Sequence, residues 1–123
     1  MTTGFTPYFW MSPGWGAWLE LTADTSHAAL VAVAGRLCRE FDGVVTERLD
    51  GTEDSKEYWW VCVSGATLLL MRKPPGVGAG LGADPRDVEL LIRIGRAWGV
   101  ERFVGWRWWV WRACRWLRGR KGV

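Results

Sequence analysis

The chain has 123 residues, of which 49% are hydrophobic, and a formal net charge of +3. This length is that of one domain, and the apolar content is sufficient for a hydrophobic core. Its three cysteines are widely spaced and form no C-x-x-C pair, which argues against a disulfide framework and against a zinc site. The first basic residue is Arg36, and proline or glycine interrupts the apolar stretches. We therefore expect a cytoplasmic protein with neither a signal peptide nor a membrane-spanning helix.

Charge is distributed unevenly along the chain. Residues 1–101 contain 9 lysines and arginines against 13 acidic residues, which gives a net charge of −4. Residues 102–123 contain 7 basic residues and no acidic residue, which gives a net charge of +7. The sequence therefore predicts an acidic domain over residues 1–101, followed by a basic tail over residues 102–123.

The first predicted elements are a hairpin and a helix. Two aromatic runs flank the segment from Ser12 to Gly16, whose Pro-Gly pair is typical of a turn between antiparallel strands. A helix over residues 25–41 follows, because apolar residues recur at helical spacing from Leu30 to Phe41.

A strand meander and a second helix complete the predicted domain. Three strand-like runs within residues 43–73 predict antiparallel strands, and the glycine-rich segment 74–83 is expected to be a loop, with at most a short edge strand. The second helix, over residues 85–98, begins with Asp84 at the cap and Pro85 in the first turn. The preceding glycines fit the G-x-G-x-x-A pattern of dinucleotide sites, but Asp84 would repel a phosphate at this helix start, so we expect no cofactor.

These elements predict an α+β fold. We expect a two-layer sandwich with an antiparallel sheet of about four to six strands, two helices on one face and a basic amphipathic helix at the C-terminus. Trp59 and Trp60 are adjacent on a predicted strand, so their rings point to opposite faces of the sheet. One of these rings then lies on the face without helices, where exposed tryptophans are typical of protein interfaces, unless another segment covers it.

The basic tail is predicted to be a helix with two different sides. One arc of about 160° on the helical wheel is apolar. This apolar arc comprises Trp106, Trp109, Val110, Ala113, Cys114, Trp116 and Leu117. The opposite side carries Arg107, Trp108, Trp111, Arg112, Arg115 and Arg118. We expect the apolar arc to pack on the domain, with two alternatives in which this second set binds a membrane surface or a nucleic acid.

No group of residues forms a recognisable catalytic centre. His27 is the only histidine, and its neighbours Asp24 and Ser26 are better explained as helix-capping residues. Without a second histidine or a cysteine cluster, we expect no metal site. The sequence therefore favours a binding protein over an enzyme.

An acidic–aromatic segment lies in the middle of the chain. It supplies Glu47, Asp50, Glu53, Asp54, Glu57, Tyr58 and Trp59. In its short length, its acidic strand–loop region and its lack of an active site, the chain resembles the small single-domain α/β proteins that bacteria pair with toxins as immunity proteins. The resemblance spans residues 17–99 and is one of architecture. It implies an inhibitor that blocks a toxin or other partner protein through these seven residues, whereas the alternative is the peripheral membrane or nucleic-acid binder.

Overall fold

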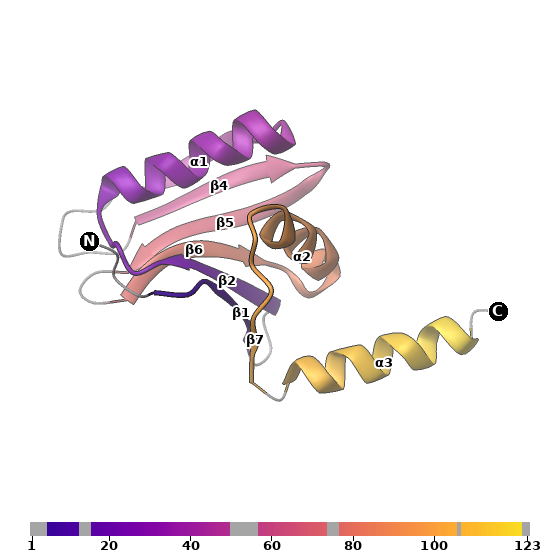
Figure 1. The fold of residues 1–123 in the computed structure, drawn as a ribbon. Coiled ribbons are helices and arrows are strands. Elements are labelled where there is room, and N and C mark those ends of the chain that lie inside the picture. The colour runs from indigo at the N-terminus through magenta and orange to yellow at the C-terminus, as the bar shows by residue number, and fades with distance from the viewer. Residues whose placement is uncertain (1–4, 13–15, 50–56, 74–76, 106, 122–123) are drawn as a thin grey trace.

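The protein has an α+β fold with one mixed sheet of seven strands, in the order β3-β4-β5-β6-β2-β1-β7 (Figure 1). The computed structural model describes residues 5–12, 16–49, 57–73, 77–105 and 107–121. In chain order the elements are β1 (Tyr8–Ser12), β2 (Gly16–Thr22), α1 (His27–Phe41), β3 (Val44–Leu49), β4 (Glu57–Val63), β5 (Ala66–Lys73), β6 (Val77–Ala83), the 3₁₀ helix η1 (Pro85–Asp87), α2 (Val88–Ala97), β7 (Phe103–Val104) and α3 (Arg107–Lys121).

Most predicted elements are confirmed close to their predicted positions. The N-terminal hairpin consists of β1 and β2, the helix predicted over residues 25–41 is α1, and the meander consists of β3, β4 and β5. The helix predicted over residues 85–98 is divided between η1 and α2. Ser26 caps α1, since its side-chain oxygen accepts a hydrogen bond from the Ala29 amide at 3.2 Å.

The sheet differs from the predicted antiparallel sheet of four to six strands in both size and direction. β7 pairs with β1 in parallel, with Phe9 opposite Phe103 and Trp10 opposite Val104. Phe103 and Val104 belong to the predicted tail, so the sheet continues past the predicted boundary at residue 101. A strand of two residues is too short to show an alternating pattern, which explains why the sequence does not reveal it.

The glycine-rich segment forms a central strand, which corrects the predicted loop or edge strand. β6 lies between β5 and β2. Its glycines leave room for the indole of Trp18, because a Cβ added at Gly80 or Gly82 would lie 3.1 Å from that ring. Trp18 is consequently only 8% exposed. The glycines therefore allow a large ring to lie close to the strand backbone.

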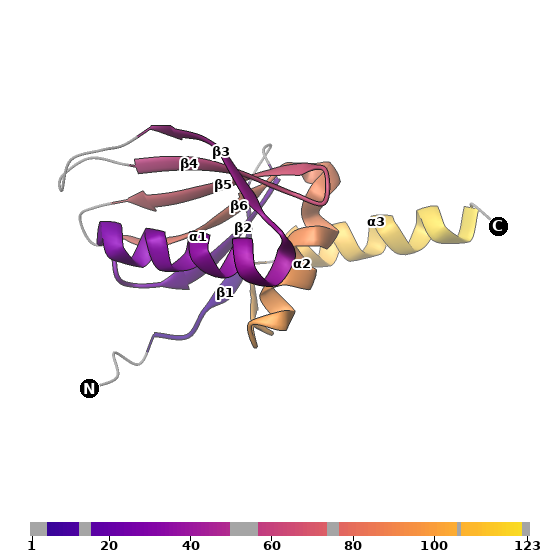
Figure 2. The same ribbon diagram turned by 90° about the horizontal axis from the view of Figure 1, so that it is seen from above.

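One face of the sheet carries the hydrophobic core, to which α1 and α2 both contribute (Figure 1). Side chains alternate along each strand, and several that point to this face are fully buried, such as Val61 and Leu68. Leu30 of α1 and Leu91 of α2 pack with them and are also fully buried. Neither helix covers the second face, which we call the open face. α3 extends away from the body in both views (Figure 1, Figure 2).

We expect Gly80→Ala to lower the free energy of unfolding by about 1–3 kcal/mol, the usual cost of overpacking. The added Cβ would collide with the backbone carbonyl of Leu19 on β2 and press against the Trp18 ring. Urea unfolding followed by circular dichroism measures the change. Gly35→Ala in α1 is the matched control, since its Cβ would meet only the flexible end of Arg39 and alanine favours a helix. A Gly80→Ala protein as stable as the control would contradict this packing.

Candidate functional site

A cluster of four rings, which we call the aromatic anchor, joins the first turn of α3 to the body. Phe9 of β1 and Phe103 of β7 stack with their ring centroids 4.7 Å apart. The indole of Trp108 meets Phe103 edge-on at 4.8 Å, and Trp111 meets Trp108 edge-on at 5.8 Å. Trp108 is 3% exposed, so the anchor buries one of the largest side chains of the helix.

The described residues of the apolar arc of α3 face solvent, which is the reverse of the predicted packing, and Trp106 lies outside the described residues. Four side chains of the arc are between 48% and 78% exposed: Val110, Leu117, Trp116 and Trp109. The residues that pack on the body are Trp108 and Trp111, which the helical wheel places among the arginines. The helix therefore contacts the body through the side that was expected to face solvent.

The reversed packing has a physical reason. A helical wheel averages polarity over a whole side of the helix, whereas the body offers one specific apolar surface, the stacked pair Phe9 and Phe103. Trp108 reaches this pair, and burial of a tryptophan with ring-to-ring contacts is more favourable than burial of a smaller aliphatic residue. Because α3 then extends away from the body (Figure 1), the described residues of the arc remain exposed, although Trp116 lines a groove beside α2.

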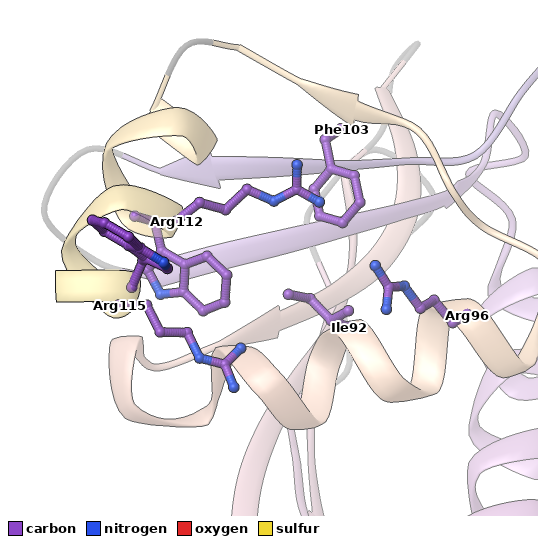
Figure 3. Close-up of a pocket in the computed structure, with 7 residues that line it drawn as sticks. Ile92, Arg96, Phe103, Arg112 and Arg115 are labelled. Carbon is purple, nitrogen blue, oxygen red and sulfur yellow. The ribbon is translucent and has the colours of Figure 1, made fainter. Parts of the chain in front are cut away.

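A groove of about 500 Å³ lies between α2, β7 and α3 (Figure 3). It is lined by Ile92, Arg96, Phe103, Trp111, Arg112, Arg115 and Trp116. The guanidinium of Arg112 lies 5.4 Å from the centroid of the Phe103 ring, and that of Arg115 lies 5.5 Å from the centroid of Trp111. Arg115 also forms an ion pair with Glu89 of α2. Ring contacts thus connect α3 to β7, and the ion pair connects α3 to α2.

The six residues predicted as an anion-binding or membrane-binding side have separate positions. Trp108 and Trp111 belong to the anchor, and Arg112 and Arg115 line the groove. Arg107 is exposed at the start of α3, and the side chain of Arg118 lies outside the described residues. The structure therefore brings four of the six together against the body.

The groove also contains residues that no sequence pattern singled out. Ile92 and Arg96 come from α2, and Phe103 comes from β7. Ile92 and Arg96 fit the helical pattern of α2, and β7 is too short to show a pattern, so only the packing of α3 beside α2 and β7 brings these residues into one site. The Trp- and Arg-rich composition of the tail indicates half of this site, and no local signal indicates the α2 half.

The seven residues of the acidic–aromatic segment do not form one exposed surface. Asp50, Glu53 and Asp54 lie outside the described residues. Glu47 is exposed and Tyr58 is half-buried, and both lie on the open face. Glu57 and Trp59 point toward α1 and are buried, which corrects their predicted role as contact residues. The reason is strand alternation, which places Glu57 and Trp59 on the opposite face from Tyr58.

Glu57 is the centre of a buried polar cluster. Its carboxylate accepts hydrogen bonds from Arg72 Nε at 2.7 Å and from Trp59 Nε1 at 2.8 Å. Nδ1 of His27, at the first residue of α1, lies 2.9 Å from the same carboxylate. Arg72 also donates to the Thr25 carbonyl at 3.2 Å, so the cluster ties the start of α1 to β4 and β5. We interpret this cluster as a structural attachment of the helix.

The surroundings of Glu57 favour its charged form. Burial alone raises the pKa of Glu57, but the hydrogen bonds from His27, Arg72 and Trp59 outweigh burial and lower the pKa from 4.5 to about 2. A carboxylate whose pKa is lower in the folded protein stabilises the fold above the unfolded pKa, and that stabilisation is lost as the pH falls toward the folded pKa.

The open face is strongly aromatic. The strand registers place one residue from each strand side by side across it, from β3 to β7: Glu47, Trp60, Leu69, Gly82, Trp18, Trp10 and Val104. Tyr58 and Trp60 stack with their centroids 6.2 Å apart, and Trp10 is 41% exposed. Of the adjacent pair Trp59 and Trp60, it is thus Trp60 that lies on the face without helices.

Comparison of the chain with protein-family models, with curated proteins and with solved structures found no match. No helix in the described part of the chain combines the length and the apolar stretch needed to cross a bilayer. The same part of the chain contains no group of three His, Cys, Asp or Glu residues placed to hold a metal ion.

We expect Glu57→Gln to lower the free energy of unfolding by about 3 kcal/mol above pH 5, the value that corresponds to the lowered pKa. The difference from the wild type should shrink as the pH falls from 4.5 toward 2, because the wild-type carboxylate becomes protonated. Urea unfolding at several pH values measures both effects. Glu47→Gln, which neutralises an exposed carboxylate, is the control. A gap between Glu57→Gln and the wild type that does not change with pH would refute the assigned role.

Proposed function

We propose that the protein binds anionic membrane surfaces peripherally, with the apolar arc of α3 inserted at the interface. The observation that supports this proposal is the solvent exposure of the described residues of the arc, on a helix that packs against the core through Trp108 and Trp111 on its other side. Helices that lie in a membrane interface have large apolar side chains with tryptophan on one face and arginines on the other. α3 has this composition, and its apolar face is accessible.

The charge distribution supports the same proposal. Residues 102–123 carry a net charge of +7, whereas residues 1–101 carry −4. A basic residue near an anionic membrane contributes about 1 kcal/mol to binding. An anionic surface would therefore attract α3 and repel the body, which orients the molecule with α3 toward the lipid.

The aliphatic part of the arc favours lipid over nucleic acid. Nucleic-acid binding uses arginines for phosphates and tryptophans for stacking on bases, and it gives no role to exposed Val110 and Leu117. In a bilayer each of these side chains would gain free energy from leaving water. The most exposed ring, Trp109, fits either ligand and so does not distinguish them.

The double variant Val110→Ser, Leu117→Ser tests this proposal. Both side chains are about half exposed and make no contribution to the core, so the fold should be retained. We expect binding to vesicles of phosphatidylcholine with phosphatidylglycerol to weaken by at least about tenfold, since two apolar side chains no longer insert. Vesicle co-sedimentation measures the loss. Val31→Ser on α1 removes another exposed aliphatic side chain and should leave binding unchanged.

Salt and a nucleic-acid probe complete this test. Insertion of apolar side chains is not screened, so part of the vesicle binding should persist at high ionic strength. A double variant that binds vesicles as well as the wild type would contradict the proposal. Binding of a single-stranded oligonucleotide, but not of vesicles, by both proteins would favour the nucleic-acid function instead.

A second candidate function, an inhibitor of the immunity type, is favoured by the open face. This face presents Trp10, Tyr58 and Trp60, which are residue types enriched in protein interfaces. Glu47 lies at its β3 edge, and Asp50, Glu53 and Asp54 follow β3 in the sequence. An aromatic surface with an acidic edge fits a basic partner protein, since opposite potentials accelerate association and exclude wrong partners.

We expect Glu47→Arg to abolish capture of one basic protein from the cells that produce this protein. Glu101→Arg makes the same charge change at an exposed position outside the strands, between α2 and β7, and should leave that capture intact. Quantitative affinity capture with both variants and the wild type makes the comparison. Equal recovery with both variants would remove the open face as the partner site.

A further inference from the structure

The groove between α2 and α3 concentrates positive charge on an apolar floor. Arg96 comes from α2, whereas Arg112 and Arg115 come from α3. Figure 3 shows Arg96 and Arg112 directed from opposite sides toward the space beside Phe103. The described lining contains no acidic residue to balance these charges.

Only part of this charge is compensated nearby. Arg115 pairs with Glu89, which lies on α2 outside the lining. Arg112 rests against the Phe103 ring and has no acidic partner within the described residues, and the same holds for Arg96. Two cations that face one space repel each other, and an anion bound between them would convert that repulsion into attraction.

The chemistry of the lining selects a type of anion. Guanidinium groups match phosphate oxygens with paired, directional hydrogen bonds, and these charge-assisted bonds are stronger than neutral ones. Ile92, Phe103 and Trp111 form apolar walls, which reduce screening by water and can contact an apolar body attached to the phosphate. A groove of about 500 Å³ has the size of a small-molecule site.

We propose that this groove binds a phosphate monoester, with Arg96, Arg112 and Arg115 holding the phosphate oxygens. The proposal goes beyond membrane attachment, because the groove exists whether or not the apolar arc inserts into lipid. A monoester exposes three oxygens, enough to engage guanidinium groups from two helices at once.

The phosphate monoester could come from a lipid headgroup or from a soluble compound. Trp116 belongs both to the exposed arc and to the lining, so the groove opens beside the face that would contact a membrane. A headgroup phosphate at that surface would lie within reach of the groove. Soluble phosphate would reach the same arginines directly from water.

Arg96→Gln tests the proposal, because Arg96 lies on α2 and its loss leaves α3 and the apolar arc unchanged. Arg93→Gln is the matched control, since it removes an equally exposed arginine of α2 outside the groove. Isothermal titration calorimetry with inorganic phosphate measures the affinity for a soluble phosphate. Vesicles that contain phosphatidic acid, compared with phosphatidylglycerol vesicles of equal surface charge, examine lipid monoesters.

We expect Arg96→Gln to weaken binding of inorganic phosphate or of phosphatidic acid by about tenfold, as loss of a charge-assisted donor implies, and Arg93→Gln to have little effect. Binding of inorganic phosphate would identify a soluble source, and a preference for phosphatidic acid alone would identify a lipid source. Equal losses with both variants, or no binding of either probe, would overturn the site. If Val110→Ser, Leu117→Ser loses vesicle binding but still binds inorganic phosphate, the apolar arc is needed for membrane binding and the groove site is unaffected.

Discussion

The packing of Trp108, at the start of α3, against the body determines how the rest of α3 is oriented. A helix turns by about 100° per residue, so fixing one side chain against the body fixes the rotation of the whole helix. With Trp108 buried beside Phe103, Trp109 must point away from the body. The indole nitrogen of Trp108 has no hydrogen-bond partner among the described residues, which costs about 1–3 kcal/mol. The ring contacts must therefore contribute more than this cost, and both the exposed arc and the groove are consequences of them.

Sequence patterns predicted the elements whose core residues recur at a regular period. α1 and the strands β4 and β5 are examples, because each buries one face and shows this in its own residues. β6 was predicted wrongly because its glycine-rich composition is typical of a loop. The glycines are needed because the ring of Trp18 on β2 packs against them, which no local pattern indicates. The rotation of α3 could not be predicted for a similar reason. It depends on Phe9, which lies at the other end of the chain.

The candidate sites show the same difference between local sequence patterns and contacts made by distant segments. The basic residues of α3 were identified from composition, but their partner Arg96 was not, because nothing local links it to them. The acidic–aromatic segment was predicted as one surface, yet alternation along β4 separates Tyr58 from Glu57. Glu57 instead stabilises the interior, where Arg72 and His27 compensate the cost of burying its charge. A run of acidic residues in a sequence thus does not distinguish a carboxylate on the surface from one in the core.

The two outer strands of the sheet are poorly suited to pair with a further strand. β3 has an irregular register between Val45 and Glu47 and carries the charged residues Glu47 and Arg48, while β7 has only two residues. An intruding strand needs a long, regular row of free amide and carbonyl groups, and neither border offers one. The protein has exposed tryptophan side chains and an aromatic open face, but its edge strands disfavour edge-to-edge pairing of sheets into fibrils. The exposed aromatic surface therefore remains accessible for specific association.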